Sequence, residues 1–216
     1  MKKLILFFVL TILFNETIFA QSKFSTNVSF RNSYLNESSA NLCDEAVIQG
    51  GGSYSLNSTF KLEVWGSTDF STDIPSPGCK EIDYNLHVKV NPKTRLVFSY
   101  FDIGDIGDFG GPNIRSLKIY HSVNDRLSGR VQYFDPKGFE NGIDLRVAWK
   151  YSDKLSIGFN TGKLPFGNPD HFTPFITYKL FSFKGWNSNL RVAHAVTGPD
   201  SMKENVNLNF SRVWSW

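Results

Sequence analysis

The stretch VNLNFSRVWSW, residues 206–216, carries large apolar side chains at every second position. Val206, Leu208, Phe210, Trp214 and Trp216 share one parity, whereas Asn and Ser occupy most of the positions between them. A period of two is typical of a β-strand with one apolar and one polar face. We therefore expect a strand that runs to residue 216 and whose apolar face is covered.

The same alternation recurs along the chain and predicts twelve strands. The apolar parity is even in the first five segments, odd in the next four and even again in the last three. Long helical periodicity is absent after the first twenty residues, so the sequence predicts an all-β fold. The expected strands are 23–34, 46–56, 59–70, 82–91, 94–102, 114–123, 126–134, 142–150, 155–162, 172–183, 189–196 and 205–216.

The connections between these segments alternate in length. The short ones are LNST at 56–59, NPKT at 91–94, VNDR at 123–126 and YSDK at 151–154, all rich in turn-forming residues. The long ones include ESSANLCDE at 37–45 and STDIPSPGCKE at 71–81. Short periplasmic turns and long extracellular loops are typical of a transmembrane antiparallel up-and-down β-barrel. Its last strand must pair with its first. Ten or eight strands are the alternatives, if 94–102 or 155–162 is not a strand.

The first twenty residues, MKKLILFFVLTILFNETIFA, read as a signal peptide. Two lysines precede an apolar run that is too short to span a membrane, and Ala20 provides a small residue at the cleavage point. We expect residues 21–216 to form one barrel in the outer membrane of a Gram-negative bacterium, in contact with its lipid. The terminal Trp216 resembles the signal read by the barrel-assembly machinery. A monomer that binds no nucleic acid is expected.

Cys43 and Cys79 are the two cysteines of the chain, and both fall in predicted long loops on the same side of the barrel. They are too widely spaced for a metal site, and an exported protein meets an oxidising compartment. We predict that they form a disulfide.

The placement of charge gives the functional prediction. On the parity opposite the apolar face lie eleven basic residues against three acidic ones, Glu63, Asp83 and Asp144. Such a surplus needs a hydrated space that conducts or binds anions. We therefore expect an outer-membrane porin that passes small anionic solutes. The predicted pore-lining residues are Arg31, Lys89, Lys118, Arg130, Arg146, Lys179 and Arg191; Lys61, Arg95, Arg126 and Lys150 are expected to lie at the periplasmic rim.

Residues 46–70, AVIQGGGSYSLNSTFKLEVWGSTDF, and EIDYN at 81–85 resemble the opening of the TorF-type porin family. That family carries an IQGGxxY strand, then a strand that ends in WGS, then an acidic residue and aromatics. The matching residues are Gln49, Gly50, Gly51, Tyr54, Trp65, Gly66, Ser67, Glu81, Asp83 and Tyr84. The resemblance implies a secreted barrel that acts as an outer-membrane porin.

Two other functions stay open. The first is a non-conducting barrel whose long loops adhere to a partner, with Glu63, Asp83 and Asp144 neutralising the lumen. The second is a lipid-modifying enzyme. Of the four histidines, His87, His121, His171 and His194, the last lies on the apolar parity near a long loop, where outer-leaflet lipid would be met. Because no hydrolase, phosphate-loop or zinc motif occurs, we expect no catalysis, cofactor or metal.

Overall fold

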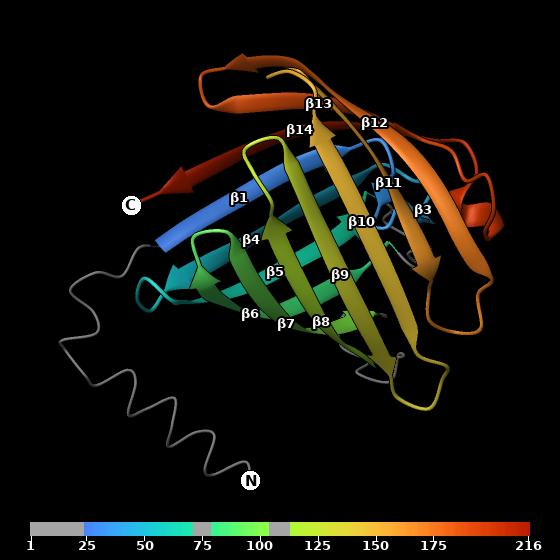
Figure 1. Ribbon diagram of the computed structural model, residues 1–216. Coiled ribbons are helices and arrows are strands. Elements are labelled where there is room, and N and C mark those ends of the chain that lie inside the picture. The colour runs from blue at the N-terminus through green and yellow to red at the C-terminus, as the bar shows by residue number, and fades with distance from the viewer. Residues whose placement is uncertain (1–23, 71–78, 104–112) are drawn as a thin grey trace, which may run out of the picture.

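The structure, a computed structural model, describes residues 24–70, 79–103 and 113–216, so the predicted signal peptide lies outside the described part. Twelve antiparallel strands close into a barrel (Figure 1). All twelve predicted strands are confirmed, and the alternatives of ten and eight are wrong. The barrel strands are β1 (Phe24–Arg31), β4 (Val47–Ser55), β5 (Phe60–Asp69), β6 (Glu81–Asn91), β7 (Thr94–Ile103), β8 (Asn113–Ser122), β9 (Leu127–Pro136), β10 (Gly142–Lys150), β11 (Leu155–Lys163), β12 (Asp170–Phe183), β13 (Trp186–Ala193) and β14 (Asn205–Ser215).

The first and last strands close the sheet. β1 pairs with β14 from Ser25 opposite Ser215 to Arg31 opposite Asn209. Beyond this register, Phe24 and Trp216 exchange two backbone hydrogen bonds of 3.1 Å, and their rings lie 5.4 Å apart. The other edge of β14 pairs with β13, so the barrel strand that carries residues 206–215 has neighbours on both sides.

The short connections all lie at one end of the barrel, which we call the turn end (Figure 1). The first residue of β1 and the last residue of β14 lie at the same end. The predicted turns form because an Asn or Ser side chain accepts backbone N–H groups two or three residues further on. Asn57 accepts from Thr59 and Phe60 at 2.8 Å, and Asn124 accepts in the same way at 2.9 Å. Asn91 and Ser152 begin their turns similarly. The strand ends that the longer connections join lie at the opposite end, the loop end.

The predicted parity separates the two faces of the wall. Large apolar side chains such as Leu62, Val64, Ile176 and Val206 point outward and are 46–53 % exposed. Polar side chains on the other parity point inward and are mostly buried, among them Gln49, Asn85, Gln132, Asp144, Asn160 and Asn207. The outside of this barrel is therefore apolar and its inside polar.

Arg212 falls on the outward, apolar parity of β14. Its guanidinium carbon lies 4.9 Å from the ring centre of Trp214 and 6.0 Å from that of Trp186. A cation above an aromatic face is attracted by the electrons of the ring. The two tryptophans therefore accommodate the charge close to the turn end.

The pattern of turn-end and loop-end connections suggested that the connection between β1 and β4 stays outside the barrel. In the structure it does not. Residues 32–46 fold inward and form a small hairpin of β2 (Tyr34–Leu35) and β3 (Asn41–Cys43). We call residues 34–43 the inner hairpin. Its Ser38, Ser39 and Ala40 are 0–2 % exposed, which shows that this part of the connection is buried.

The helical content of the described residues is one 3₁₀ turn, η1 (Asp200–Met202), between β13 and β14. Within those residues, no helix is long and apolar enough to cross a membrane.

Replacing Asn124 with Ala should destabilise the barrel by roughly 0.5–1.5 kcal/mol, because two backbone N–H groups lose their acceptor while the turn stays exposed to water. Urea-induced unfolding of the refolded protein measures the change. Asp125→Ala, in the same turn, is the matched control and should have little effect. Equal losses in both variants would contradict the role given to the Asn side chain.

Candidate functional site in the barrel lumen

The inner hairpin is fixed to the barrel wall by hydrogen bonds at its tip. Ser38 donates from Oγ to Oδ2 of Asp144 at 2.9 Å. Asn160 donates from Nδ2 to Oγ of Ser39 at 2.7 Å, and Asn205 donates to the Ser39 carbonyl oxygen at 2.9 Å. These bonds join the hairpin to three different strands, β10, β11 and β14, so the tip cannot shift without breaking several contacts.

Apolar packing and the disulfide hold the base of the hairpin. Cys43 and Cys79 form the predicted disulfide, which is confirmed, with their Cα atoms 5.0 Å apart. Tyr34 lies with its ring centre 5.9 Å from that of Trp65 on β5. Leu42 packs against this region and against a second buried cluster at the loop end. That second cluster contains Ala40, Phe101, Ile114, Phe134, Leu164, Ala195 and Met202.

Asp144 is the centre of the polar network beneath the hairpin. It is fully buried, it pairs with Arg130, and its Oδ1 lies 3.0 Å from Nε2 of His171. Arg130, only 2 % exposed, also donates to Ser38 and pairs with Glu37 at 2.6 Å. A buried carboxylate is tolerated when it is paired and hydrogen-bonded. Arg130 therefore acts mainly in the link between the wall and the hairpin.

Glu37 projects from the hairpin into the lumen, and 48 % of its side chain remains exposed there. Its Oε2 lies 3.5 Å from Nζ of Lys118, and both carboxylate oxygens accept from the Tyr120 hydroxyl at 3.0 Å. Burial opposes ionisation, but Lys118 and Arg130 outweigh it and lower the pKa of Glu37 below its usual range. The carboxylate is therefore charged at neutral and mildly acidic pH.

Tyr34 connects the hairpin to acidic residues on β6. Its hydroxyl donates to Oε2 of Glu81, and Asp83 lies on the same face of the strand. Burial and the nearby carboxylates of Glu81 and Asp83 raise the pKa of Tyr34 well above its ordinary value. The phenol therefore stays protonated and continues to donate.

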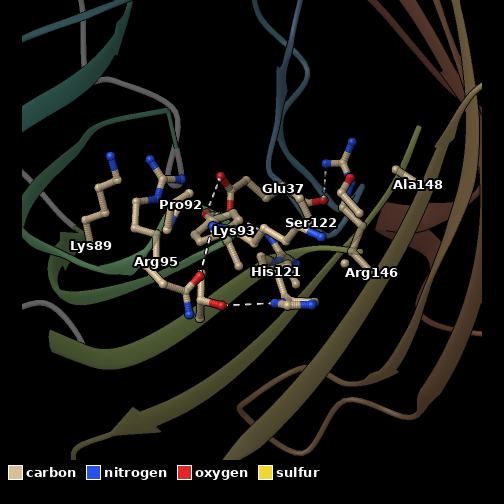
Figure 2. A pocket seen from close by; sticks show the side chains of 15 residues that line it. Glu37, Lys89, Pro92, Lys93, Arg95, His121, Ser122, Arg146 and Ala148 are labelled. Carbon is tan, nitrogen blue, oxygen red and sulfur yellow. Dashed lines mark hydrogen bonds and ion pairs between the residues drawn. The ribbon is translucent and has the colours of Figure 1, made fainter. Parts of the chain in front are cut away.

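A cavity of about 530 Å³ opens between the hairpin and the turn end. Figure 2 shows Glu37, on the blue chain, between Lys89 and Arg95 on one side and Arg146 on the other. The guanidinium carbon of Arg95 lies 4.4 Å from the ring centre of Tyr120. The described lining includes one carboxylate, Glu37, and five cationic side chains: Lys89, Lys93, Arg95, Arg130 and Arg146. We call it the turn-end cavity; its charge is strongly positive.

A second cavity, of about 390 Å³, lies on the other side of Glu37, towards the loop end. Its described lining has two cationic side chains, Arg31 and Lys118. It has four acidic ones: Glu37, Glu63, Glu81 and Asp83. Among described residues, Glu37 is shared by the linings of these two cavities and no other residue is. The lumen is therefore divided at Glu37 into a basic and a more acidic compartment.

The seven predicted pore-lining residues separate into groups. Lys89, Arg130 and Arg146 line the turn-end cavity. Arg31 and Lys118 line the loop-end cavity, and Arg191 donates to Ser39 of the hairpin at 2.6 Å. Lys179 lies beside a bulge of β12 at the turn end and lines neither cavity. Arg95, expected at the rim, lines the turn-end cavity as well.

The four histidines lie in four different environments. His87 pairs with Glu63 at 2.8 Å and His171 with Asp144, both inside the barrel. His121 lies 3.0 Å from the Thr94 hydroxyl at the turn end. His194 lines a shallow apolar depression on the outside, and its side chain forms no hydrogen bond or ion pair with any described residue. Across the described residues, no three His, Cys, Asp or Glu side chains are grouped to hold a metal.

The alternation of the sequence did not predict a part in the site for the hairpin residues Tyr34, Glu37, Ser38 and Ser39, or for Phe175. The sequence does mark Phe175 as unusual, because it is an aromatic residue on the polar, inward parity of β12. The run of small residues Ser38, Ser39 and Ala40 is a second signal, since small side chains suit a segment packed against a wall.

No protein-family model matches the chain, and no curated protein matches it. The fold is similar to solved structures. A KdgM porin has a TM-score of 0.52 at 10 % identity, over 90 % of this chain and 99 % of that one. A KdgM porin in complex with disordered oligogalacturonate gives 0.50 at 10 % identity, with the same coverage. A structure from work on in-meso crystallization of membrane proteins gives 0.54 at 10 % identity, over 90 % of this chain and 84 % of that one.

Replacing Cys43 and Cys79 together with Ser should destabilise the folded barrel by roughly 3–4 kcal/mol, because the bond closes a segment with a sequence separation of 36 residues. Urea unfolding of the oxidised wild type and the variant measures the difference. The wild type in reductant should approach the variant, whereas the variant should not respond to reductant. Equal midpoints for all samples would show that the disulfide does not support the hairpin.

Proposed function

We propose that this protein is an outer-membrane porin that passes small anionic solutes by diffusion, with the inner hairpin as its constriction. The observation that carries the proposal is the turn-end cavity, where five cationic side chains face one carboxylate. Positive charge around a narrow aqueous space attracts anions and repels cations. The closed barrel supplies the wall that such a path requires.

The apolar exterior supports a membrane location. In water, a continuous apolar surface of this kind would drive aggregation. Every barrel strand is paired on both sides, so no described edge needs a polar partner from outside. Lipid would solvate the outward side chains, and Trp214 and Trp186 beside Arg212 suit a membrane interface. The likeness to KdgM porins supports the barrel fold of this proposal.

The resemblance of residues 46–70 and 81–85 to TorF-type porins fits the same function, and membership in that family is part of the proposal. We also propose that the final strand, through Trp216, is recognised by the barrel-assembly machinery and that the barrel acts as a monomer. Catalysis is not proposed, because the outward His194 has no partner among the described side chains that could activate it.

The inner hairpin supports a second candidate function as well. It fills part of the lumen and is held by buried contacts, as expected of a plug in a barrel that stabilises the membrane or displays loops. Conductance separates the two functions: discrete current steps in a planar bilayer support the porin, and a correctly folded barrel without current supports the plugged alternative.

In a salt gradient, the reversal potential should show anion preference. Glu37→Gln should raise the anion-to-cation permeability ratio, and Arg146→Ser should lower it, each by roughly two- to fivefold, since each removes one charge at the cavity. Lys137→Ser, on an exposed loop, is the control and should leave the ratio unchanged. Shifts of the same sign for Glu37→Gln and Arg146→Ser would contradict electrostatic selection here.

Val131→Arg should destabilise the barrel in phosphatidylcholine vesicles by roughly 2–4 kcal/mol, because this outward residue lies in the middle of β9, at the depth of the lipid core. Val123→Arg is the matched control. It is also exposed but lies in a turn, so a loss of only about 0–1 kcal/mol is expected. Urea unfolding measures both, and equal losses would contradict a membrane-embedded exterior.

A further inference from the structure

Phe175 lies in an unusual position on the inner wall. Its side chain points into the lumen from β12 and is only 3 % exposed. The neighbouring strand β11 carries Gly158, where an added Cβ would come within 2.7 Å of the Phe175 ring. The ring therefore rests on the bare backbone of β11, towards β10. A side chain at residue 158 would displace it.

Two arginines contact this ring. The guanidinium carbon of Arg146, on β10, lies 4.5 Å from the ring centre, and that of Arg191, on β13, lies 4.4 Å from it. The two strands flank the pair β11 and β12. Contact with an aromatic face stabilises a cation and orients its plane, but it uses none of its N–H donors. Phe175 thus holds two positive charges near each other with most of their donors available.

No ion pair within the described part of the protein neutralises these two arginines. Arg130 pairs with Glu37 and Asp144, but neither Arg146 nor Arg191 forms an ion pair with a described carboxylate. Their hydrogen bonds go to the hairpin tip. Arg146 donates to the Glu37 carbonyl oxygen at 3.5 Å, and Arg191 donates to Ser39. Nε of Arg191 is buried without a partner.

Each guanidinium has five N–H donors in a planar fork, and a single described hydrogen bond to each leaves most of them free. Like charges held together in a partly buried place require a counter-charge. A chloride ion would supply charge alone, whereas an oxyanion can also accept two parallel N–H bonds from one fork. Arg146 lines the turn-end cavity, so such an anion can reach it from there.

We propose that Arg146 and Arg191, positioned by Phe175, form a binding site for an oxyanion, a carboxylate or phosphate group carried by the solute. The site deepens the proposed function, on which it rests, by assigning the solute to a chemical class. Phe175 is the positioning residue, and the two arginines are the groups that contact the anion.

The test measures the chloride current through the refolded protein at constant ionic strength while inorganic phosphate or succinate is added. In the wild type, either anion should reduce the current in a saturable way. The double variant Arg146→Lys/Arg191→Lys keeps both charges but loses the planar forks, and Phe175→Leu loses the platform. Each should raise the half-blocking concentration about tenfold or more. Lys137→Ser is the control and should match the wild type.

Saturable block by phosphate would assign the site to phosphate esters, and block by succinate would assign it to carboxylates; either result supports the proposal. The absence of saturable block by both anions, or equal half-blocking concentrations in the wild type and the Lys variant, would overturn it. If chloride still passes with anion preference in that case, the proposed porin function stands.

A second measurement does not depend on conduction. Phosphate or succinate should raise the thermal unfolding midpoint of the wild type in detergent above that in chloride of equal ionic strength, since a ligand of the folded state stabilises it. The rise should be lost in Arg146→Lys/Arg191→Lys. A barrel that does not conduct but shows this rise would contradict the porin while supporting the oxyanion site, and an equal rise in both proteins would overturn the site.

Discussion

Closure of the sheet between β1 and β14 is the constraint on which the rest of the structure depends. A barrel strand in an apolar medium must satisfy its backbone groups within the sheet, and closure removes the two edges that would otherwise remain. Once the register from Ser25 opposite Ser215 to Arg31 opposite Asn209 is set, each residue faces either the lumen or the exterior. A slip of one residue in β14 would bring Val206 and Leu208 inward and place Asn205 and Asn207 outside.

Closure of twelve strands also creates a space wider than short polar side chains can fill. The inner hairpin occupies part of it, and its sequence suits that place. Ser38 and Ser39 present hydroxyls to Asp144, Asn160 and Arg191, and their small size allows close approach to the wall. The apolar cluster around Met202 and the disulfide stabilise the opposite side of the hairpin. The lumen is thereby narrowed around Glu37 instead of being open along its whole width.

The strands could be predicted from the sequence because their information is local. A period of two and a turn that begins with Asn or Ser lie within a dozen residues, and Asn57, Asn91, Asn124 and Ser152 all form the turns expected of them. The pairing of Cys43 with Cys79 followed from their number and their common side of the barrel. The position of the hairpin could not be obtained in this way. Its contacts join Ser38 to Asp144 and Ser39 to Asn205, residues more than a hundred positions apart.

The same limit applies to the charges of the lumen. Parity identified Arg130, Arg146 and Arg191 as inward-facing. It could not show which of them has an ion pair, since Glu37, which pairs with Arg130, belongs to the hairpin and lies far away in the sequence. Lys179, on the same parity, ends beside a bulge and contributes to neither cavity. Phe175 broke the polar pattern of its strand, and the structure shows the reason in the two guanidinium groups above its ring.

The contrast between Arg130 and its two neighbours, Arg146 and Arg191, explains how one inner wall can be rigid and still carry positive charge that no described carboxylate pairs with. The charge of Arg130 is balanced by Glu37 and Asp144, so removing it would take an ion-pair partner from both carboxylates and would weaken the attachment of the hairpin. Arg146 and Arg191 are oriented by an aromatic ring, which stabilises a cation without cancelling its charge. Carboxylates in place of the ring would also fix the arginines, but they would cancel the positive charge beside the turn-end cavity. An aromatic platform is thus the arrangement that leaves a positioned positive charge available to a solute.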